Sequence, residues 1–267
     1  MKKLLITMIV LISIVIGCLI GYKMIGEGNM KNYVTPSRVF VTGNLHGKLN
    51  IEKLSEENFI TQKELGKTDN LIIVGDFGLI WDESIEDEML LDNLSKKNYN
   101  ILFIDGAHEN FTLLNEYEIV DLYGGKAHKI RDNIYHLIRG EVYTIAGKKY
   151  LAFGGGESVD KKHREKGISY WDEEIPNNME WGNLESNLQS NNNYVDYILT
   201  YTPPSSDLKM IGAKLGRNLG EGSEINKKLE NLSKNIKYKK WFHSYYHLDL
   251  ELNRKHISLN DNIIEIN

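Results

Sequence analysis

The sequence predicts an α/β fold in which one α/β sheet packs on a second, more antiparallel sheet. Short apolar runs rich in strand-forming residues occur at positions 38–42, 70–74 and 100–104, and each ends in Gly or Asp-Gly. Stretches with helical character separate these runs, whereas the second half of the chain is richer in strand-like sequence. Strands that first alternate with helices and later follow one another indicate this two-sheet arrangement.

The first three runs have the character of strands buried on both faces, because their apolar residues are nearly continuous. A helix is expected between the second and third runs. Residues 84–87 (Ser-Ile-Glu-Asp) have the spacing of a capping box, and the apolar Met89, Leu90 and Leu94 follow. This pattern predicts that a helix begins near Ser84.

A hairpin is predicted next, because the strand-like residues 141–145 and 150–153 flank the turn-forming segment 146–149. Three glycines at positions 154–156 end the hairpin and open a polar stretch that runs to about residue 193.

The last third of the chain predicts further strands and one helix. Residues 195–200 are strand-like, and residues 240–243 lead into the last motif described below. Ser223 precedes apolar residues at helical spacing, which are Ile225, Leu229, Leu232 and Ile236. Residues 248–252 and 263–266 are expected to be closing strands.

Composition limits the classes of function and of site. The chain has 267 residues, enough for one large domain or two small ones, and its 41% hydrophobic residues can supply a core. A formal net charge of -5 argues against nucleic acid as a main partner, because phosphate binding needs clustered Lys and Arg. The two short basic runs, 161–164 and 237–240, are therefore assigned to a solvated surface. Cys18 is the single cysteine, so a metal site would use His, Asp, Glu or Asn.

Residues 1–25 are predicted to be a transmembrane anchor or signal segment. Two lysines at the amino terminus precede an uncharged apolar run over residues 4–22. As a helix this run would be about 28 Å long, close to the ~30 Å hydrocarbon core of a bilayer. We favour an uncleaved helix that anchors the domain to the membrane on the extracytoplasmic side. Residues 26–37 are then a linker, and the domain covers residues 38–267.

Two other interpretations of the amino-terminal segment stay open. It fits a cleaved secretory signal, although no clear cleavage site of small residues ends it. It also fits a lipoprotein signal, because residues 15–18 resemble a lipobox and Cys18 would be acylated. Against the lipoprotein, residues 19–22 continue the apolar run past the cysteine.

Short segments with chemically active residues follow four of the predicted strands, and a fifth lies near the end of the chain. They are Thr-Gly-Asn-Leu-His-Gly at 42–47, Val-Gly-Asp-Phe-Gly at 74–78, Ile-Asp-Gly-Ala-His-Glu-Asn at 104–110, Leu-Thr-Tyr-Thr-Pro-Pro at 199–204 and Ser-Tyr-Tyr-His at 244–247. Open α/β sheets place ligand chemistry at the carboxyl ends of their strands. The segments therefore predict a single site.

These segments resemble the motifs of calcineurin-like metallophosphoesterases, in particular a small bacterial and phage branch of that family. The family carries Gly-Asp-x-His-Gly, Gly-Asp, Gly-Asn-His-Glu, a His after a strand, and Gly-His-x-His. Flanking residues add to the resemblance, among them Trp81-Asp82, residues 171–176 and Trp241-Phe242. The resemblance covers residues 38–267 and implies a four-layer α/β/β/α sandwich, preceded here by the one N-terminal membrane helix.

The resemblance also implies a site for two metal ions. One ion would be held by Asn44, His46, Asp76 and His247. The second would be held by Asp76, which bridges the two ions, and by the residues at positions 107, 201 and 245. His108 would lie beside the scissile phosphate as an acid or electrostatic partner.

Several of these positions differ from the family. Ala107 stands where the family has an asparagine, and Tyr201 and Tyr245 stand where it has histidines. Asn44 replaces an aspartate, and Ser244 replaces a glycine. An alanine offers no side-chain lone pair, and a neutral tyrosine is a poor ligand because its ordinary pKa is about 10. The second metal site is therefore expected to be lost.

The first site keeps two histidines and a carboxylate. His46, Asp76 and His247 form a ligand set with open positions, suited to at most one Mn, Fe or Zn ion. Asn44 could add a neutral carbonyl oxygen. Structural roles compete with this assignment, since the two histidines could pack without an ion and Asp76 could cap its turn. His108 could likewise serve only to hold the loop that contains the following glutamate.

Other polar residues are given structural roles. The remaining histidines, at positions 128, 136, 163, 243 and 256, have no motif around them and are expected in surface or structural positions. Arg139 is assigned by default to a surface salt bridge, with an anionic ligand as the alternative. Tyr201 and Tyr245 would add bulk to the former metal cleft and fill it.

The leading hypothesis is a membrane-anchored metallophosphoesterase-like domain that is catalytically degenerate and serves in binding or as a scaffold. Its ligand would be a phosphoester or a protein partner. The main alternative is an active hydrolase, a single-metal phosphomonoesterase or phosphodiesterase that uses His46, Asp76, His247 and His108. A third is a structural envelope protein whose cleft binds nothing. The degenerate form is favoured because ligand positions are altered while neighbouring scaffold residues match the family.

Overall fold

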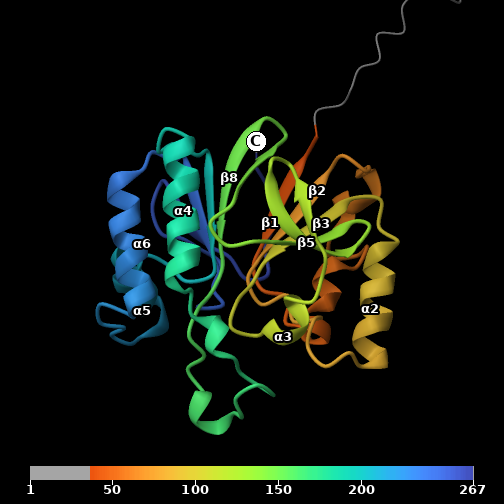
Figure 1. The fold of residues 1–267 in the computed structure, drawn as a ribbon, viewed down its shortest axis with the longest axis horizontal. Helices are drawn as coiled ribbons and strands as arrows, with labels where there is room; N and C mark the ends of the chain where they lie inside the picture. Colours follow the sequence, from red (N-terminus) through yellow and green to blue (C-terminus); the bar gives the residue numbers. More distant parts are fainter. Residues whose placement is uncertain (1–36, 267) are drawn as a thin grey trace, which may run out of the picture. The chain divides into compact units, whose positions relative to one another are not determined.

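Two mixed β-sheets and the helices beside them make up residues 37–266, the part of the chain that the computed structural model describes (Figure 1). Within these residues, no helix is both long and apolar enough to cross a bilayer. The predicted anchor or signal segment, residues 1–25, and the linker up to residue 36 lie outside the described part of the chain.

The first sheet has the strand order β13-β1-β2-β3-β6-β5-β4. Its strands are β1 (Val39–Thr42), β2 (Asn70–Val74), β3 (Asn100–Ile104), β4 (Ile119–Leu122), β5 (Gly125–Arg131), β6 (Ile134–Leu137) and β13 (Ile263–Ile266). The pairs β1–β2, β2–β3 and β3–β6 are parallel, whereas the pairs toward both edges are antiparallel. The first three predicted strands are confirmed, and they lie side by side.

The second sheet has the strand order β11-β12-β10-β9-β8-β7. Its strands are β7 (Val142–Ile145), β8 (Lys148–Phe153), β9 (Tyr197–Thr200), β10 (Lys240–His243), β11 (Leu250–Glu251) and β12 (His256–Ser258). The expectation of a more antiparallel second sheet is wrong, because β8–β9, β9–β10 and β10–β12 are parallel. Helices make the crossovers that parallel pairs require: α4 (Asn178–Ser190) after β8, and α5 (Leu208–Leu215) with α6 (Glu224–Asn235) after β9.

The predicted hairpin is confirmed as β7 and β8, but its turn is shorter than expected. Only Ala146 and Gly147 lie between the strands, and both have positive φ, 50° and 74°. This backbone is typical of two-residue hairpin turns, whose twist matches that of the strands. The predicted closing strands belong to different sheets, since β13 pairs with β1 and β11 pairs with β12.

Side-chain caps mark where the longer helices begin. α2 (Ile85–Ser95) follows Ser84, whose hydroxyl accepts a backbone hydrogen bond in the first turn, as the sequence predicts. α6 follows Ser223, which forms a reciprocal capping box. α4 follows Asn177 and has a capping box with Glu180, inside the stretch that the sequence marks only as polar. Short 3₁₀ helices cover Gly47–Leu49, Ile51–Leu54, Ile60–Glu64, Lys161–His163, Asp172–Glu174 and Ser205–Asp207.

Apolar residues fill both faces of the first sheet, because successive side chains of a strand point to opposite faces. Val39 and Val41 of β1 belong to a core that also contains Leu199 and Phe242 of the second sheet, while Phe40 belongs to an outer core. That outer core includes residues of α2 and of the short α3 (Phe111–Leu114). A third core joins the second sheet to α4 and α6. Figure 1 shows α4 and α6 on one side of the two sheets and α2 on the other.

The fold places the five motif segments in the loops after β1, β2, β3, β9 and β10. β1, β2 and β3 are parallel neighbours in the first sheet, and β9 and β10 are parallel neighbours in the second. The carboxyl ends of parallel neighbours lie at one edge of a sheet, so these loops can meet.

Candidate metal centre

Three predicted metal ligands come together from loops that are far apart in the sequence. His46 follows β1, Asp76 follows β2 and His247 follows β10. Each offers one ligand atom, and these atoms all lie within 4.8 Å of one another. The rings of His46 and His247 are in edge contact, with centroids 4.8 Å apart. This cluster is called the triad below.

The backbone of the triad is held in an uncommon conformation. His46, Asp76 and His247 all have positive φ, at 51°, 41° and 51°. For residues other than glycine this region costs roughly 1–2 kcal/mol each. Backbone hydrogen bonds hold the first two loops against each other, because Leu45 N and His46 N both donate to the carbonyl of Asp76, at 3.0 and 2.7 Å. The tertiary structure therefore fixes where these side chains point.

Asp76 is fully buried, and both of its carboxylate oxygens accept hydrogen bonds. Oδ1 accepts from the backbone N–H groups of Ala107 and His108, at 2.7 and 2.9 Å. Oδ2 accepts from the hydroxyl of Tyr201 at 2.7 Å. Burial by itself raises the pKa of Asp76, but His108, His46 and Tyr201 together outweigh it and leave the pKa below its usual value. Asp76 is therefore ionised at neutral pH.

Both histidines of the triad are electrically neutral at physiological pH. Burial lowers the pKa of His46 to about 4, although the nearby Asp76 acts in the opposite direction. Desolvation also lowers the pKa of His247, whose ring packs against His46 although the residue as a whole is exposed. A neutral imidazole has the free lone pair that a metal ion needs.

One buried polar atom of the triad lacks a hydrogen-bond partner among the described residues. His46 Nε2 is buried, lies 3.7 Å from Asp76 Oδ2 and has no hydrogen-bond partner among the described residues. Two neutral imidazoles and an ionised carboxylate are a suitable donor set for one Zn, Fe or Mn ion. The residues of the triad therefore fit a single divalent cation.

Asn44 is the fourth predicted ligand of this ion. It is fully buried, its Nδ2 lies 3.4 Å from the carbonyl of Ser244, and its Oδ1 has no hydrogen-bond partner among residues 37–266. Lys53, which the sequence does not single out, binds the backbone of this segment. Its ammonium donates to the backbone carbonyls of Asn44 and Asn260, at 2.6 Å in each case. Burial lowers the pKa of Lys53 to about 8.

Tyr201 lies where the sequence places a ligand of the second ion. It is buried, and burial followed by the nearby Asp76 raises its pKa well above 10, so its hydroxyl stays protonated and donates. Its ring lies on Gly75, where a Cβ atom would be 2.2 Å from Tyr201 Cδ2, so only glycine fits at that position. The side chain of Ala107, also buried, contributes only a methyl group.

Tyr245 fills less of the space predicted for the second ion than the sequence suggests. It is only half-buried, its ring centroid is 5.1 Å from that of Tyr201, and its hydroxyl donates to the carbonyl of Glu157 at 2.7 Å. Its phenol oxygen is therefore engaged by another loop and is not bonded to Asp76.

His108 lies directly beside the triad. Its Nδ1 is 3.4 Å from Asp76 Oδ2 without hydrogen-bond geometry, and its ring centroid is 5.3 Å from that of His46. The next residue, Glu109, is fully buried and accepts hydrogen bonds from Phe77 N and Gly78 N, at 2.7 and 3.3 Å. The carboxyl group of Glu109 thus clamps the loop of Asp76 directly.

Arg164 is a site residue that the sequence places wrongly, in a solvated surface run. Its guanidinium hydrogen-bonds to His108 Nε2 and to the carbonyl of Ser169 at 3.0 Å, and forms an ion pair with Asp160 at 2.8 Å. Its side chain is only 15% exposed. Nothing in the spacing of the run 161–164 distinguishes Arg164 from its basic neighbours, so the sequence does not identify it as a site residue. Lys162 and His163 of the same run are exposed, as expected.

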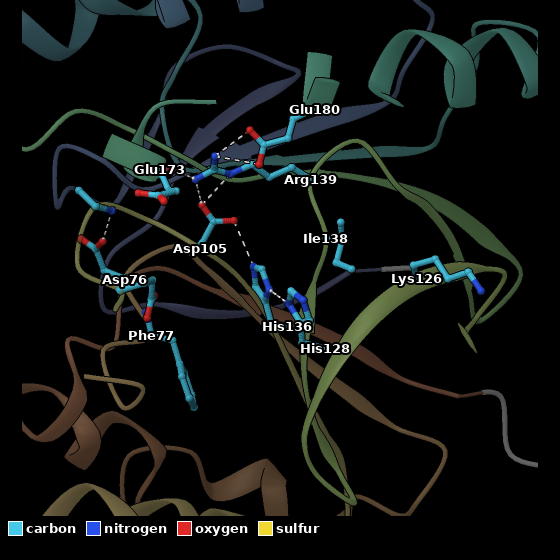
Figure 2. A network of polar contacts seen from close by, with 12 residues as sticks. Asp76, Phe77, Asp105, Lys126, His128, His136, Ile138, Arg139, Glu173 and Glu180 are labelled. Atoms are coloured by element: carbon cyan, nitrogen blue, oxygen red, sulfur yellow. Dashed lines mark hydrogen bonds and ion pairs between the residues drawn. The ribbon is translucent and has the colours of Figure 1, made fainter. Parts of the chain in front are cut away.

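Arg139 was expected in a surface salt bridge, and that assignment is wrong because the residue is buried. Figure 2 shows it between Asp105 and Glu180. Arg139 Nε donates to Asp105 at 2.9 Å and Nη1 donates to Glu180 at 3.2 Å. Burial raises the pKa of Asp105, but Arg139 and His136 outweigh it and bring the pKa to about 2. The network ties the start of the loop that carries His108 to α4.

The remaining histidines have structural or surface positions, as expected. His136 hydrogen-bonds to Asp105 and to His128, and both histidines are buried (Figure 2). His256 and His243 are buried beside Asp207, at 2.8 and 3.3 Å. These two pairs of histidines are buried inside the fold and do not belong to the triad.

Two hollows adjoin the triad, and His108 lines both. The larger one, called the cleft below, has a volume of about 570 Å³. Its lining includes the basic or aromatic residues His108, Arg164, Arg217, Tyr245, Tyr246 and His247, the acidic Glu157 and Asp160, and several apolar residues. The smaller one, of about 360 Å³, is lined by His46, Trp81, Asp82 and His108, among others. A ligand in either hollow can therefore reach the triad.

Neither a scan against protein-family models nor a search of the curated proteins finds a match to this chain.

Proposed function

We propose that residues 38–267 form a metallophosphoesterase-like domain that binds one divalent metal ion and a phosphoester, and that hydrolyses the ester slowly or not at all. The order of the five motifs along the chain supports this proposal, and so does the meeting of their loops at one site. The proposal includes the four-layer α/β/β/α sandwich, supported by the two sheets with separate helices beside each. It retains the membrane anchor predicted from residues 1–25.

The observation that carries the proposal is the 2.7 Å hydrogen bond from Tyr201 to Asp76 Oδ2. In a two-metal site, ions about 3.5–4 Å apart clamp the attacking and leaving oxygens, and a bridging carboxylate must contact both. Here Asp76 Oδ1 accepts hydrogen bonds from two backbone N–H groups. Oδ2 accepts the hydrogen bond from Tyr201 and lies 3.7 Å from His46 Nε2. On this proposal, one ion would bind at the triad and none at the position of Tyr201.

Each residue of the site would have a definite task. His46, Asp76 and His247 would hold the ion, and Asn44 Oδ1 would be available as a neutral fourth donor. The bound ion would act as a Lewis acid on a phosphoryl oxygen. His108 would lie next to that phosphoryl group, and the buried Tyr201 would exclude water from the side where a second ion would sit.

Metal stoichiometry tests the proposal. The purified full chain is stripped with a chelator, reloaded with Zn²⁺ or Mn²⁺, and its metal content measured. At most one ion per chain is expected, with near-background turnover of generic phosphomonoesters and phosphodiesters. The combined variant Asn44→Asp, Ala107→Asn, Tyr201→His and Tyr245→His should bind a second ion and gain turnover. Two tightly bound ions in the unmodified chain would contradict the proposal.

An active single-metal phosphoesterase is the second candidate. It is favoured by the position of His108, which lines both hollows and has Nδ1 3.4 Å from Asp76 Oδ2. Robust turnover by the unmodified chain, lost in Asp76→Ala, would select this candidate. Asp76→Ala is informative only alongside a folding control, because the buried carboxylate also accepts hydrogen bonds from Ala107 and His108.

A further inference from the structure

Arg164 is the charged residue of the cleft that touches His108. We infer that Arg164 is the residue that recognises the phosphoryl oxygens of the ligand, and that it binds them by exchanging His108 for the anion. The inference rests on the proposed single-metal function and adds to it the side chain that selects for an anionic ligand.

Position is the first reason. One nitrogen of the His108 imidazole faces Asp76 Oδ2 at 3.4 Å, and the other contacts Arg164. The guanidinium is thus separated from the anchoring carboxylate of the triad by the width of one imidazole ring. A phosphoryl group that places one oxygen on an ion at the triad can place another within reach of Arg164.

The donors of Arg164 are the second reason. A guanidinium has five N–H groups in one plane. Each nitrogen has one contact: Nε forms an ion pair with Asp160, and Nη1 and Nη2 hydrogen-bond to Ser169 and His108. Nη1 and Nη2 therefore each keep one further N–H group without a partner among residues 37–266. A planar pair of donors matches two oxygens of a phosphoryl group.

The nature of the His108 contact is the third reason. Arginine only donates, so His108 Nε2 accepts in this contact through an imidazole lone pair and not through an anionic oxygen. A hydrogen bond from a guanidinium to an anionic oxygen is roughly twice as strong as one to a neutral acceptor. An incoming phosphoryl oxygen is therefore a better partner for Nη2 than the imidazole. The ion pair with Asp160 and the hydrogen bond to Ser169 keep the guanidinium in place during this exchange.

The charges around the cleft favour an anion there. Asp160 is paired with Arg164 at 2.8 Å, and Glu157 lies 3.8 Å from Lys161. Each acidic residue that lines the cleft thus has a cationic neighbour. Arg217 adds a further positive charge to the lining.

Phosphate binding by the full chain loaded with Zn²⁺ tests the inference, with inorganic phosphate as the probe and calorimetry as the measurement. Arg164→Ala should weaken phosphate binding roughly 10- to 100-fold, which corresponds to losing a charge-assisted pair of hydrogen bonds. Arg164→Lys should be intermediate, because it keeps the charge but loses the planar pair. Lys162→Ala is the matched control: this lysine is exposed in the same turn, and its removal should change the affinity less than about twofold.

A second comparison separates direct binding from an indirect effect through His108. If Arg164 only positioned His108, then Arg164→Ala would have no further effect in a His108→Ala background. Direct contact predicts that the double variant binds phosphate about tenfold or more weakly than His108→Ala alone. Loss of that difference would overturn the inference, as would unchanged phosphate affinity in Arg164→Ala or no phosphate binding by the unmodified chain at millimolar concentration.

Zn²⁺ affinity distinguishes this failure from failure of the proposed function. Arg164 contacts no atom of the triad in the described structure, so Arg164→Ala should bind Zn²⁺ as the unmodified chain does. If the unmodified chain bound no Zn²⁺, the proposed function would fail, while phosphate binding by the metal-free chain would still report on Arg164.

Discussion

The hydroxyl of Tyr201 donates a 2.7 Å hydrogen bond to Oδ2 of Asp76, the carboxylate at the centre of the triad. The two residues come from different sheets, since Asp76 follows β2 and Tyr201 follows β9. A neutral phenol thereby occupies the carboxylate oxygen that a second cation would need. In the proposed function, this contact would leave the triad with room for one ion only.

Removing that hydroxyl should lower stability and improve metal binding. Tyr201→Phe keeps the buried ring but leaves Asp76 Oδ2 without this donor, which should cost about 1–3 kcal/mol of the free energy of unfolding in the presence of a chelator. The freed oxygen should also raise the affinity for Zn²⁺. Urea denaturation and calorimetry measure the two effects.

Tyr245→Phe is the matched control for this change. Its hydroxyl bonds to the neutral carbonyl of Glu157, so the loss should be about 1 kcal/mol or less, with no gain in Zn²⁺ affinity. Equal effects of the two substitutions would show that the contact between Tyr201 and Asp76 has no special role.

Arg139→Met should destabilise the fold strongly. The substitution leaves Asp105 buried without its main cationic partner, and breaking a buried pair in this way costs about 3–5 kcal/mol. The loop that carries His108 begins at Asp105, so Zn²⁺ affinity should fall as well. Chemical denaturation and metal titration measure both quantities.

Lys129→Met is the control for Arg139→Met, because Lys129 makes an exposed ion pair with Asp132 at 2.8 Å. An exposed pair of this kind contributes about 0–1 kcal/mol. A loss of 1 kcal/mol or less for Arg139→Met would mean that the buried network does not hold the loop.

Stability in the absence of metal should fall as the pH drops from about 6.5 to about 4. Burial lowers the pKa of both His46 and His128 to about 4, whereas the pKa of an unfolded histidine is about 6.5. In this window the unfolded chain binds protons that the folded chain does not, so acid favours unfolding. Because a tenfold difference in proton affinity corresponds to about 1.4 kcal/mol, each of the two histidines should contribute roughly 3 kcal/mol.

Urea denaturation across this pH range, with a chelator present, measures the effect. His128→Gln should reduce the slope of stability against pH, whereas His163→Gln, at an exposed position, should not. An unchanged slope in His128→Gln would contradict the expected burial of this imidazole as a neutral group, since the raised pKa values of Asp87, Glu109 and Glu174 act in the opposite direction in both chains. Below about pH 4, protonation of Asp105, whose pKa is about 2, should add a further loss.

Local sequence signals located much of the fold. Continuous apolar runs marked β1, β2 and β3, and Ser84 and Ser223 marked the starts of α2 and α6. α4 was not found, because only Leu184 and Leu188 of that helix are fully buried and its composition is polar. The spacing of Asn177 and Glu180 was the signal that could have revealed it.

The strands β4, β5 and β6 were also not found. β4 and β5 carry charged and partly exposed residues, so they lack the apolar run that marks a central strand. β6 is largely buried, but it has only four residues and includes His136. The sequence predicts a more antiparallel second sheet, whereas three of its strand pairs are parallel, and the reason for this error is different. Strand direction depends on how the chain crosses over between strands, and that is a property of the topology and not of any one segment.

The sequence by itself determined which residue types are available for chemistry: two histidines and a carboxylate in motif segments, with alanine and tyrosines at the positions where the family resemblance predicts further ligands. These residue types follow from the chain alone, because the donor atoms of a side chain do not depend on the fold. The tertiary structure decided that His46, Asp76 and His247 meet, that Tyr201 bonds to Asp76, and that Arg164 reaches His108. Those contacts join loops distant in sequence, and polar groups of this kind leave no periodic pattern, so only the packed sheets bring them to one point.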